Sequence, residues 1–231
     1  MMKRIYIHGL GQTAHSWDKV IEASDNRDNI VCPDLPGLIG DKEPTYENLY
    51  AAFSKMCDAK DEELILCGLS LGGVLALNYA VEHVKKVKAL VLIATPYKMP
   101  KAALMLQNIV FRFMPDSGFK GIGFTKRDFI KLCKSMMELD FTDALHKITC
   151  PVLVVCGEND TANMKASVKM ADILQDADMQ TVKGAAHEVN AQAPEALSQI
   201  LEDFYKTKLQ NSKIYQGVRR GVYESDYKKN V

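Results

Sequence analysis

Short apolar runs alternate with longer segments of helical periodicity along most of this chain. Several runs are apolar at nearly every position, which is typical of strands buried on both faces of a parallel sheet. Helices between successive strands supply the crossover connections that parallel strands require. The pattern therefore predicts an α/β fold with a mostly parallel sheet of about six strands and helices on both faces. The expected strands lie at residues 4–8, 29–32, 64–68, 88–94, 151–157 and 179–182, and the expected helices near 16–23, 46–59, 74–82, 165–174 and 194–206.

One segment, residues 97–147, interrupts this alternation: it carries no strand signal and is predicted to form several short helices. Its first helix, near residues 102–114, is apolar on nearly every face, so it must be covered by another element or must itself cover one. We expect a helical lid with Leu104, Met105 and Met136 as candidate substrate contacts, although packing within the lid is the commoner fate of such side chains. The predicted organisation is a core at 1–96 and 148–207, the lid at 97–147 and a polar C-terminal tail at 208–231.

Composition and charge narrow the class of protein. A chain of 231 residues with 47% apolar residues can bury one good core. Its 29 basic and 29 acidic residues balance, which gives no indication of a nucleic-acid partner or an anionic membrane. No apolar run reaches the length of a membrane span, and the first residues do not have the pattern of a signal peptide. We therefore expect a cytoplasmic protein without stable membrane insertion.

The six cysteines show no CxxC pair, and no Cys/His cluster has the spacing of metal ligands. Cys67 and Cys156 fall within apolar strand runs, where thiols usually behave as small buried hydrophobes. The expectation is a reduced protein that holds no metal and no cofactor.

A candidate nucleophile follows the third expected strand. Residues 68–72 read G-x-S-x-G, with Ser70 at the centre, and a helix begins directly afterwards. A serine on such a strand-to-helix turn has an exposed hydroxyl, and the glycines allow the tight turn and the close approach of neighbouring backbone. The alternative is an ordinary glycine-rich turn, so the assignment depends on whether a base and an acid lie within reach.

The base and the acid are sought at later strand ends, where the chemistry of parallel sheets gathers. Of five histidines, His187 lies in a loop just after the last strand, which suits a base, whereas His83 and His146 lie near helix ends among lysines and His15 begins a helix. Asp160 is the preferred acid; Glu158 is its rival, and a helix N-cap is the structural alternative for Asp160.

Together these motifs resemble the α/β-hydrolase superfamily in its chain order of serine, acid and histidine. The resemblance rests on G-L-S-L-G at 68–72, G-E-N-D at 157–160, G-A-A-H at 184–187, H-G-L-G at 8–11 and D-L-P-G at 34–37, and it covers about residues 3–207. It implies that Ser70 is the nucleophile, His187 the base and Asp160 the orienting acid. It also implies that the backbone N–H groups of Leu10 and Leu71 form the oxyanion hole.

Three functions remain open at this point. The first is hydrolysis of small or apolar-acyl carboxylic esters through an acyl-enzyme, with a small-molecule ester as partner and an oligomeric state that the sequence leaves undetermined. The second is a C–C bond hydrolase, aminopeptidase or lyase of the same superfamily, whose substrate carboxylate would be held by cations of the lid. The third is a binding protein that keeps the fold without turnover. The cations in question are Lys98, Lys101, Arg112, Lys126 and Arg127.

Overall fold

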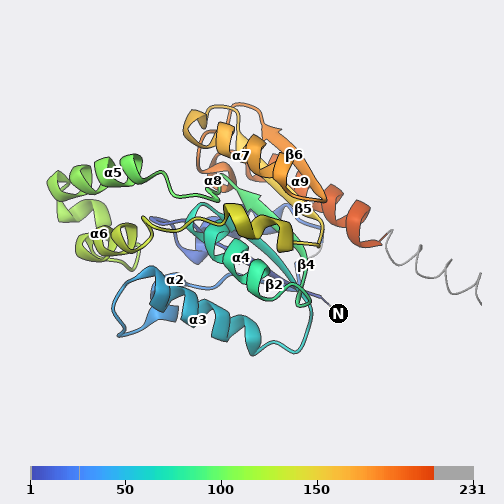
Figure 1. Cartoon of the computed structure of the whole chain (residues 1–231), viewed down its shortest axis with the longest axis horizontal. Coiled ribbons are helices and arrows are strands. Elements are labelled where there is room, and N and C mark those ends of the chain that lie inside the picture. Colours follow the sequence, from blue (N-terminus) through green and yellow to red (C-terminus); the bar gives the residue numbers. More distant parts are fainter. Residues whose placement is uncertain (1, 26, 211–231) are drawn as a thin grey trace, which may run out of the picture.

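The computed structural model describes residues 2–25 and 27–210 of the chain. Six strands form one fully parallel sheet in the order β2-β1-β3-β4-β5-β6 (Figure 1). The predicted α/β class and strand number are therefore confirmed. The strands are β1 (Lys3–Ile7), β2 (Ile30–Val31), β3 (Leu64–Leu69), β4 (Val87–Ile93), β5 (Val152–Gly157) and β6 (Ala177–Val182).

The sheet has a hydrophobic core on each face, because its central strands are apolar at successive positions. In β3, Leu64 and Leu66 belong to one core cluster, whereas Ile65 and Cys67 belong to the other. The first cluster contains side chains of α3, α4 and α7, and the second contains side chains of α1 and α9. This two-sided burial is the physical origin of the unbroken apolar runs. The helices are α1 (Asp18–Glu22), α3 (Tyr46–Asp58), α4 (Leu71–Glu82), α7 (Thr161–Ile173), α8 (Val189–Gln192) and α9 (Pro194–Tyr205).

The helices differ from the sequence-based expectation most clearly at α4, α7 and α2. Helix α4 begins at Leu71 and α7 at Thr161, three and four residues earlier than predicted, because each starts directly at a strand-to-helix turn. A short helix, α2 (Leu35–Ile39), replaces the expected turn at residues 34–37. Asp34 caps it by accepting the Gly37 N–H at 3.0 Å, and a proline in the first helical turn needs no N–H of its own.

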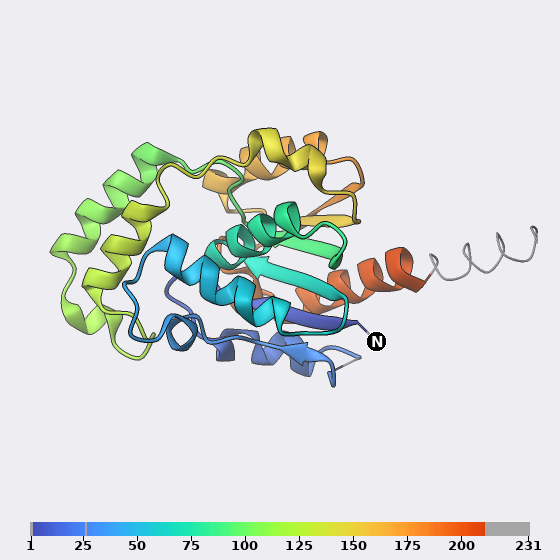
Figure 2. The same ribbon diagram turned by 60° about the horizontal axis from the view of Figure 1, so that its bottom comes forward.

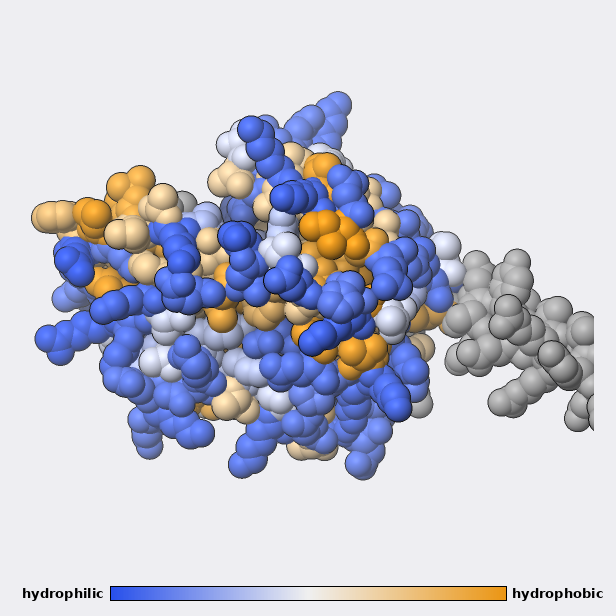
Figure 3. Space-filling view, viewed as in Figure 1, coloured by the Kyte–Doolittle hydropathy of each residue, from blue (hydrophilic) through white to orange (hydrophobic). Residues whose placement is uncertain are grey.

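The segment expected to form a lid contains α5 (Lys101–Phe113) and α6 (Lys126–Ser135), joined by the 3-10 helix η2 (Asp116–Phe119). Figure 2 shows the two helices side by side, beyond the carboxyl ends of the strands. Helix α6 contacts α3, whereas α5 packs chiefly on α6. Half or more of each large apolar side chain on the outer face of α5 is therefore exposed, and this face forms an apolar patch (Figure 3); its residues are Met105, Leu106, Ile109, Val110 and Phe113.

Gly72 lies where α4 passes closest to β1. A Cβ added at this position would lie 2.2 Å from the carbonyl oxygen of Ile7, so the backbone itself would have to move. We expect Gly72→Ala to lower the free energy of unfolding by about 3 kcal/mol, the upper range for overpacking a buried site. Urea denaturation measures this change.

Gly118→Ala is the matched control. The added methyl group would meet its nearest neighbour, the Met114 methyl group, at an ordinary 3.5 Å. The free energy of unfolding should change by no more than about 0.5 kcal/mol. Equal stability of the two variants would contradict the close backbone contact between α4 and β1.

Within residues 2–25 and 27–210, no helix combines the length and the apolar composition that a membrane crossing needs.

Candidate active site

Ser70 occupies a strained turn between β3 and α4. Its backbone has φ 52° and ψ −114°, a region that side-chain-bearing residues rarely adopt. The turn is held by the Ser70 N–H, which donates to Ile93 O at 2.9 Å, and by the Ser70 carbonyl, which accepts from the Val74 N–H at 3.0 Å. The half-buried side chain makes no hydrogen bond with another described residue. Such a conformation is retained only where the surroundings enforce it, and it marks Ser70 as a functional candidate.

Asp160 and His187 meet at the ends of β5 and β6. His187 Nδ1 lies 2.8 Å from Asp160 Oδ2, and the Asp160 side chain is 4% exposed against 44% for His187. A Cβ on Gly157 would lie 2.2 Å from the Ala186 carbonyl oxygen, so a glycine is needed where the strand end touches the His187 loop. The rival carboxylate, Glu158, is exposed and accepts the Gly184 N–H at 2.9 Å instead. Asp160 is thus the carboxylate in contact with the histidine, and it also caps α7.

The loop after β1 lies beside Ser70. A Cβ built on Gly9 would lie 3.6 Å from Ser70 Cβ, which places the H-G-L-G segment next to the serine. Leu71 is the first residue of α4, so its N–H has no partner inside the helix. Neither this N–H nor that of Leu10 donates to another residue of the described part of the chain. Both N–H groups thus lack a partner among the described residues, which leaves them available as the oxyanion donors that the sequence predicts.

A buried amide pair connects this loop to the segment after His187. Gln12 Nε2 donates to Asn190 Oδ1 at 3.0 Å, and Asn190 Nδ2 donates back to Gln12 Oε1 at 3.1 Å. The Gly9 N–H also donates to Gln12 Oε1, at 3.4 Å. Both amides are buried, so this reciprocal bond fixes the position of the two loops relative to each other.

His8 joins the same loop to α2 and must be neutral to do so. Its Nδ1 faces Gly9 O at 2.9 Å, and a carbonyl only accepts, so Nδ1 carries the proton. Its Nε2 accepts the Leu35 N–H at 3.2 Å. Burial lowers the pKa of His8 below its ordinary value of 6.5, and the hydrogen bond to Gly9 and the charge of Asp34 oppose this shift only in part.

The depressed pKa of His8 predicts a loss of stability on acidification. The unfolded chain binds a proton at His8 near pH 6.5 and the folded chain only at lower pH, so acid favours unfolding. The contribution of His8 to the free energy of unfolding should be constant above pH 6.5 and should fall as the pH drops below that value. Urea denaturation from pH 7.5 to 5 measures the slope.

His8→Gln should flatten this slope, because a glutamine does not titrate. The control is His15→Gln, which removes an exposed histidine whose ion-pair partner among the described residues is Asp18; the fall in stability below pH 6.5 should remain in this variant. An unchanged slope in His8→Gln would contradict the assignment of a buried neutral imidazole.

The remaining histidines lie away from this constellation. His15 belongs to the 3-10 helix η1 (Ala14–Trp17), and His83 caps the C-terminus of α4 while stacking on Tyr79. His146 is exposed in the 3-10 helix η3 (Thr142–Lys147). Among the described residues, no group of three or more His, Cys, Asp or Glu side chains is placed to hold a metal ion.

The candidate substrate contacts of residues 97–147 occupy three different environments. Met136 is 5% exposed inside the core cluster, Leu104 packs half-buried against the same cluster, and Met105 is 58% exposed on the apolar patch of α5. The burial of Met136 is accounted for by packing. The role of these residues in substrate binding stays a prediction.

Most of the candidate carboxylate-binding cations of residues 97–147 form ion pairs within that segment. Lys98 forms an ion pair with Asp140 at 2.7 Å, and Lys101 pairs with Glu138. Lys126 lies 3.6 Å from Asp116. Arg112 and Arg127 have no ion pair with a described residue. Three of the five candidate carboxylate-binding cations are thus already neutralised by acidic neighbours.

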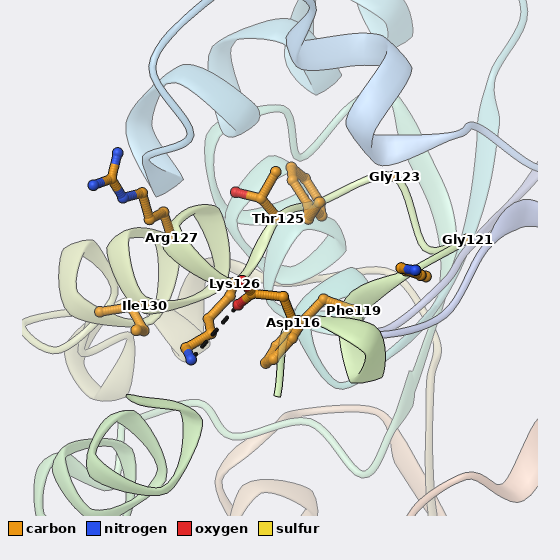
Figure 4. Close-up of a pocket in the computed structure, with 10 residues that line it drawn as sticks. Asp116, Phe119, Gly121, Gly123, Thr125, Lys126, Arg127 and Ile130 are labelled. Atoms are coloured by element: carbon orange, nitrogen blue, oxygen red, sulfur yellow. Dashed lines mark ion pairs between the residues drawn. The ribbon is translucent and has the colours of Figure 1, made fainter. Parts of the chain in front are cut away.

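A cavity of about 720 Å³ lies between η2 and the start of α6 (Figure 4). Phe119, Phe124 and Ile130 provide apolar walls, and Lys126 reaches across to Asp116 at its edge. None of Ser70, Asp160 and His187 lines it. The cavity therefore belongs to the segment 97–147 rather than to the Ser70 site.

The model of the alpha/beta hydrolase family matches residues 5–200, and the chain therefore belongs to this family. It is 29% identical over 91 residues to a pimeloyl-(acyl-carrier protein) methyl ester esterase from Nitrosomonas europaea, a match that covers 39% of this chain and 36% of that protein. It is 22% identical over 237 residues to the biotin biosynthesis bifunctional protein BioHC from Cellvibrio japonicus, covering 88% and 47%. The matches thus span less than half the length of these curated relatives.

Solved structures share the fold of this chain. The enol-lactonase from Burkholderia xenovorans LB400 superposes with a TM-score of 0.77 at 18% identity, covering 89% of this chain and 92% of that one. MenH from S. aureus gives a TM-score of 0.74 at 17% identity, covering 90% and 94%. These likenesses show the fold. The chain is a member of a hydrolase family with esterases among its relatives.

Sequence reasoning did not find three polar residues of this site: Gln12 and Asn190 of the amide pair, and Asn163, whose side-chain amide contacts Asp160 and His187. The two residues of the amide pair are 178 positions apart, and nothing in either local sequence indicates the other. Asn163 follows Asp160 by three positions, a spacing that the helix N-cap explains by itself.

Proposed function

We propose that this protein is a serine hydrolase that cleaves carboxylic esters through an acyl-enzyme. Ser70 is the nucleophile, His187 the general base and Asp160 the acid that orients the base. The observation that carries the proposal is the 2.8 Å contact between His187 Nδ1 and Asp160 Oδ2, at the same sheet edge as a serine in a strained strand-to-helix turn.

The reaction follows from the roles of these groups. Ser70 Oγ attacks the ester carbonyl carbon while His187 Nε2 takes the hydroxyl proton, and Asp160 stabilises the imidazolium through Nδ1–H. The N–H groups of Leu10 and Leu71 stabilise the oxyanion. Breaking of the C–O bond releases the alcohol, which takes its proton from His187. Water then attacks the acyl-enzyme by the same route and releases the acid and Ser70.

The substrate class is proposed to be an ester with an apolar acyl group. The helices beyond the carboxyl ends of the strands carry apolar side chains that could hold such a group, among them the half-buried Leu104. The pairing of Lys98, Lys101 and Lys126 with acidic neighbours supports this class over one that presents a carboxylate. The name of the Nitrosomonas europaea relative states a pimeloyl-(acyl-carrier protein) methyl ester, which is a carboxylic ester.

Labelling with a fluorophosphonate probe tests the proposal, because the probe reacts only with an activated serine. Wild-type protein should be labelled and Ser70→Ala should not, with both proteins folded by circular dichroism. Failure of folded wild-type protein to react would favour a binding protein over an enzyme. Faster turnover of carboxylate-bearing substrates than of a panel of neutral acyl esters would favour the lyase and C–C hydrolase alternatives.

A further inference from the structure

The side-chain amide of Asn163 contacts both partners of the Asp160–His187 pair. Its Nδ2 lies 3.0 Å from Asp160 Oδ1 and 2.9 Å from Asp160 Oδ2. The same atom lies 3.2 Å from His187 Nδ1. Asn163 is in the first turn of α7, so the helix that Asp160 caps also delivers this amide to the pair. Helix capping requires only the backbone N–H of Asn163, which donates to Asp160 Oδ1 at 3.2 Å, and therefore does not explain the side-chain contacts.

The orientation of the amide follows from its neighbours. A carboxylate only accepts hydrogen bonds, so the nitrogen of the amide, and not its oxygen, must face the two Asp160 oxygens. The amide nitrogen of Asn163 donates hydrogen bonds and cannot accept one, so it cannot accept the proton of His187 Nδ1. Among the described residues, the acceptor at that nitrogen is then Asp160 Oδ2, at 2.8 Å.

We propose that Asn163 is a positioning residue for the catalytic base, an inference that rests on the proposed function. Its amide holds the Asp160 carboxylate by both oxygens and keeps Oδ2 directed at His187. This arrangement places the proton on Nδ1 and leaves the lone pair of Nε2 free for the Ser70 proton. If the amide is removed, Asp160 Oδ1 still accepts the backbone N–H of residue 163 and Oδ2 still contacts His187. The carboxylate then lacks the one donor that contacts both of its oxygens and fixes its orientation.

Asn163→Ala tests this role on the full chain. We expect kcat for an activated ester to fall about tenfold, the change that the loss of one hydrogen bond to a charged group produces, with KM within about twofold of wild type. Asn163→Asp should lose more than Asn163→Ala, because it replaces the donor with a second carboxylate beside Asp160. Thr161→Ala is the control: Thr161 is exposed in the same helical turn, and this variant should retain wild-type kcat.

A proton NMR measurement gives a readout that does not depend on turnover. The His187 Nδ1 proton, held by a carboxylate, should give a low-field signal that His187→Ala abolishes and thereby assigns. Asn163→Ala should shift or broaden this signal, whereas Thr161→Ala should leave it unchanged.

Unchanged kcat together with an unchanged low-field signal in folded Asn163→Ala would overturn the positioning role. If Asn163→Ala does not fold, the isosteric Asn163→Asp decides by the same two measurements. If folded wild-type protein neither hydrolyses the ester nor reacts with the fluorophosphonate probe, the proposed function is overturned instead. The NMR comparison would still test the contact between Asn163 and the Asp160–His187 pair.

Discussion

Replacing Ser70 with alanine is expected to lower kcat for an activated ester by about 10⁶-fold, as in well-studied serine triads. The reason is that the substitution removes the attacking oxygen and leaves only the oxyanion donors and binding. The fold should persist, because the hydroxyl makes no hydrogen bond with another described residue and alanine keeps the same Cβ in the turn. Initial rates with a p-nitrophenyl ester and the thermal midpoint Tm measure the two effects.

Ser70→Gly provides the control that separates chemistry from folding. It should be as inactive as Ser70→Ala, but it should also have a higher Tm, because glycine adopts φ 52° without strain. A higher Tm would show that the backbone of the turn is strained when residue 70 carries a side chain. Activity of Ser70→Ala within tenfold of wild type would contradict the assignment of the nucleophile.

The strands and the serine turn could be predicted because their signals are local. Each strand of the sheet's centre is apolar at successive positions, and G-x-S-x-G follows one of them directly. The beginning of α4 was predicted too late, at residue 74, because the glycines at 72 and 73 have poor helix propensity. The structure tolerates them there because neighbouring backbone and Thr95 leave no room for a side chain.

The polar contacts that hold the site together could not be predicted, because they join distant segments. Gln12 and Asn190 meet only because the sheet brings the loop after β1 and the segment after β6 together at the carboxyl ends of its strands. The same limit applies to the helices of residues 97–147. The apolar composition of α5 is visible in the sequence, but which of its faces packs on α6 depends on the tertiary arrangement, and the structure leaves Phe113 85% exposed.

Replacing Asp160 with asparagine is expected to lower kcat by about 10⁴-fold, the size of effect known for the orienting acid of serine triads. The new amide can face His187 with its nitrogen, and Nδ1 then accepts that N–H instead of donating its own proton. The imidazole proton moves to Nε2, which can no longer take the proton of Ser70. Rates with the same activated ester measure the loss, and the low-field Nδ1 proton signal should disappear.

The helix cap does not account for this loss, because asparagine caps helices as well as aspartate does. Asp34→Asn provides the matched test: Asp34 caps α2 through the Gly37 N–H at 3.0 Å, as Asp160 caps α7 through the Asn163 N–H at 3.2 Å. Asp34→Asn should keep kcat within about twofold of wild type, since a neutral cap costs little. A large loss in both variants would assign the effect to helix capping, whereas a loss confined to Asp160→Asn assigns it to the proton that Asp160 holds on His187.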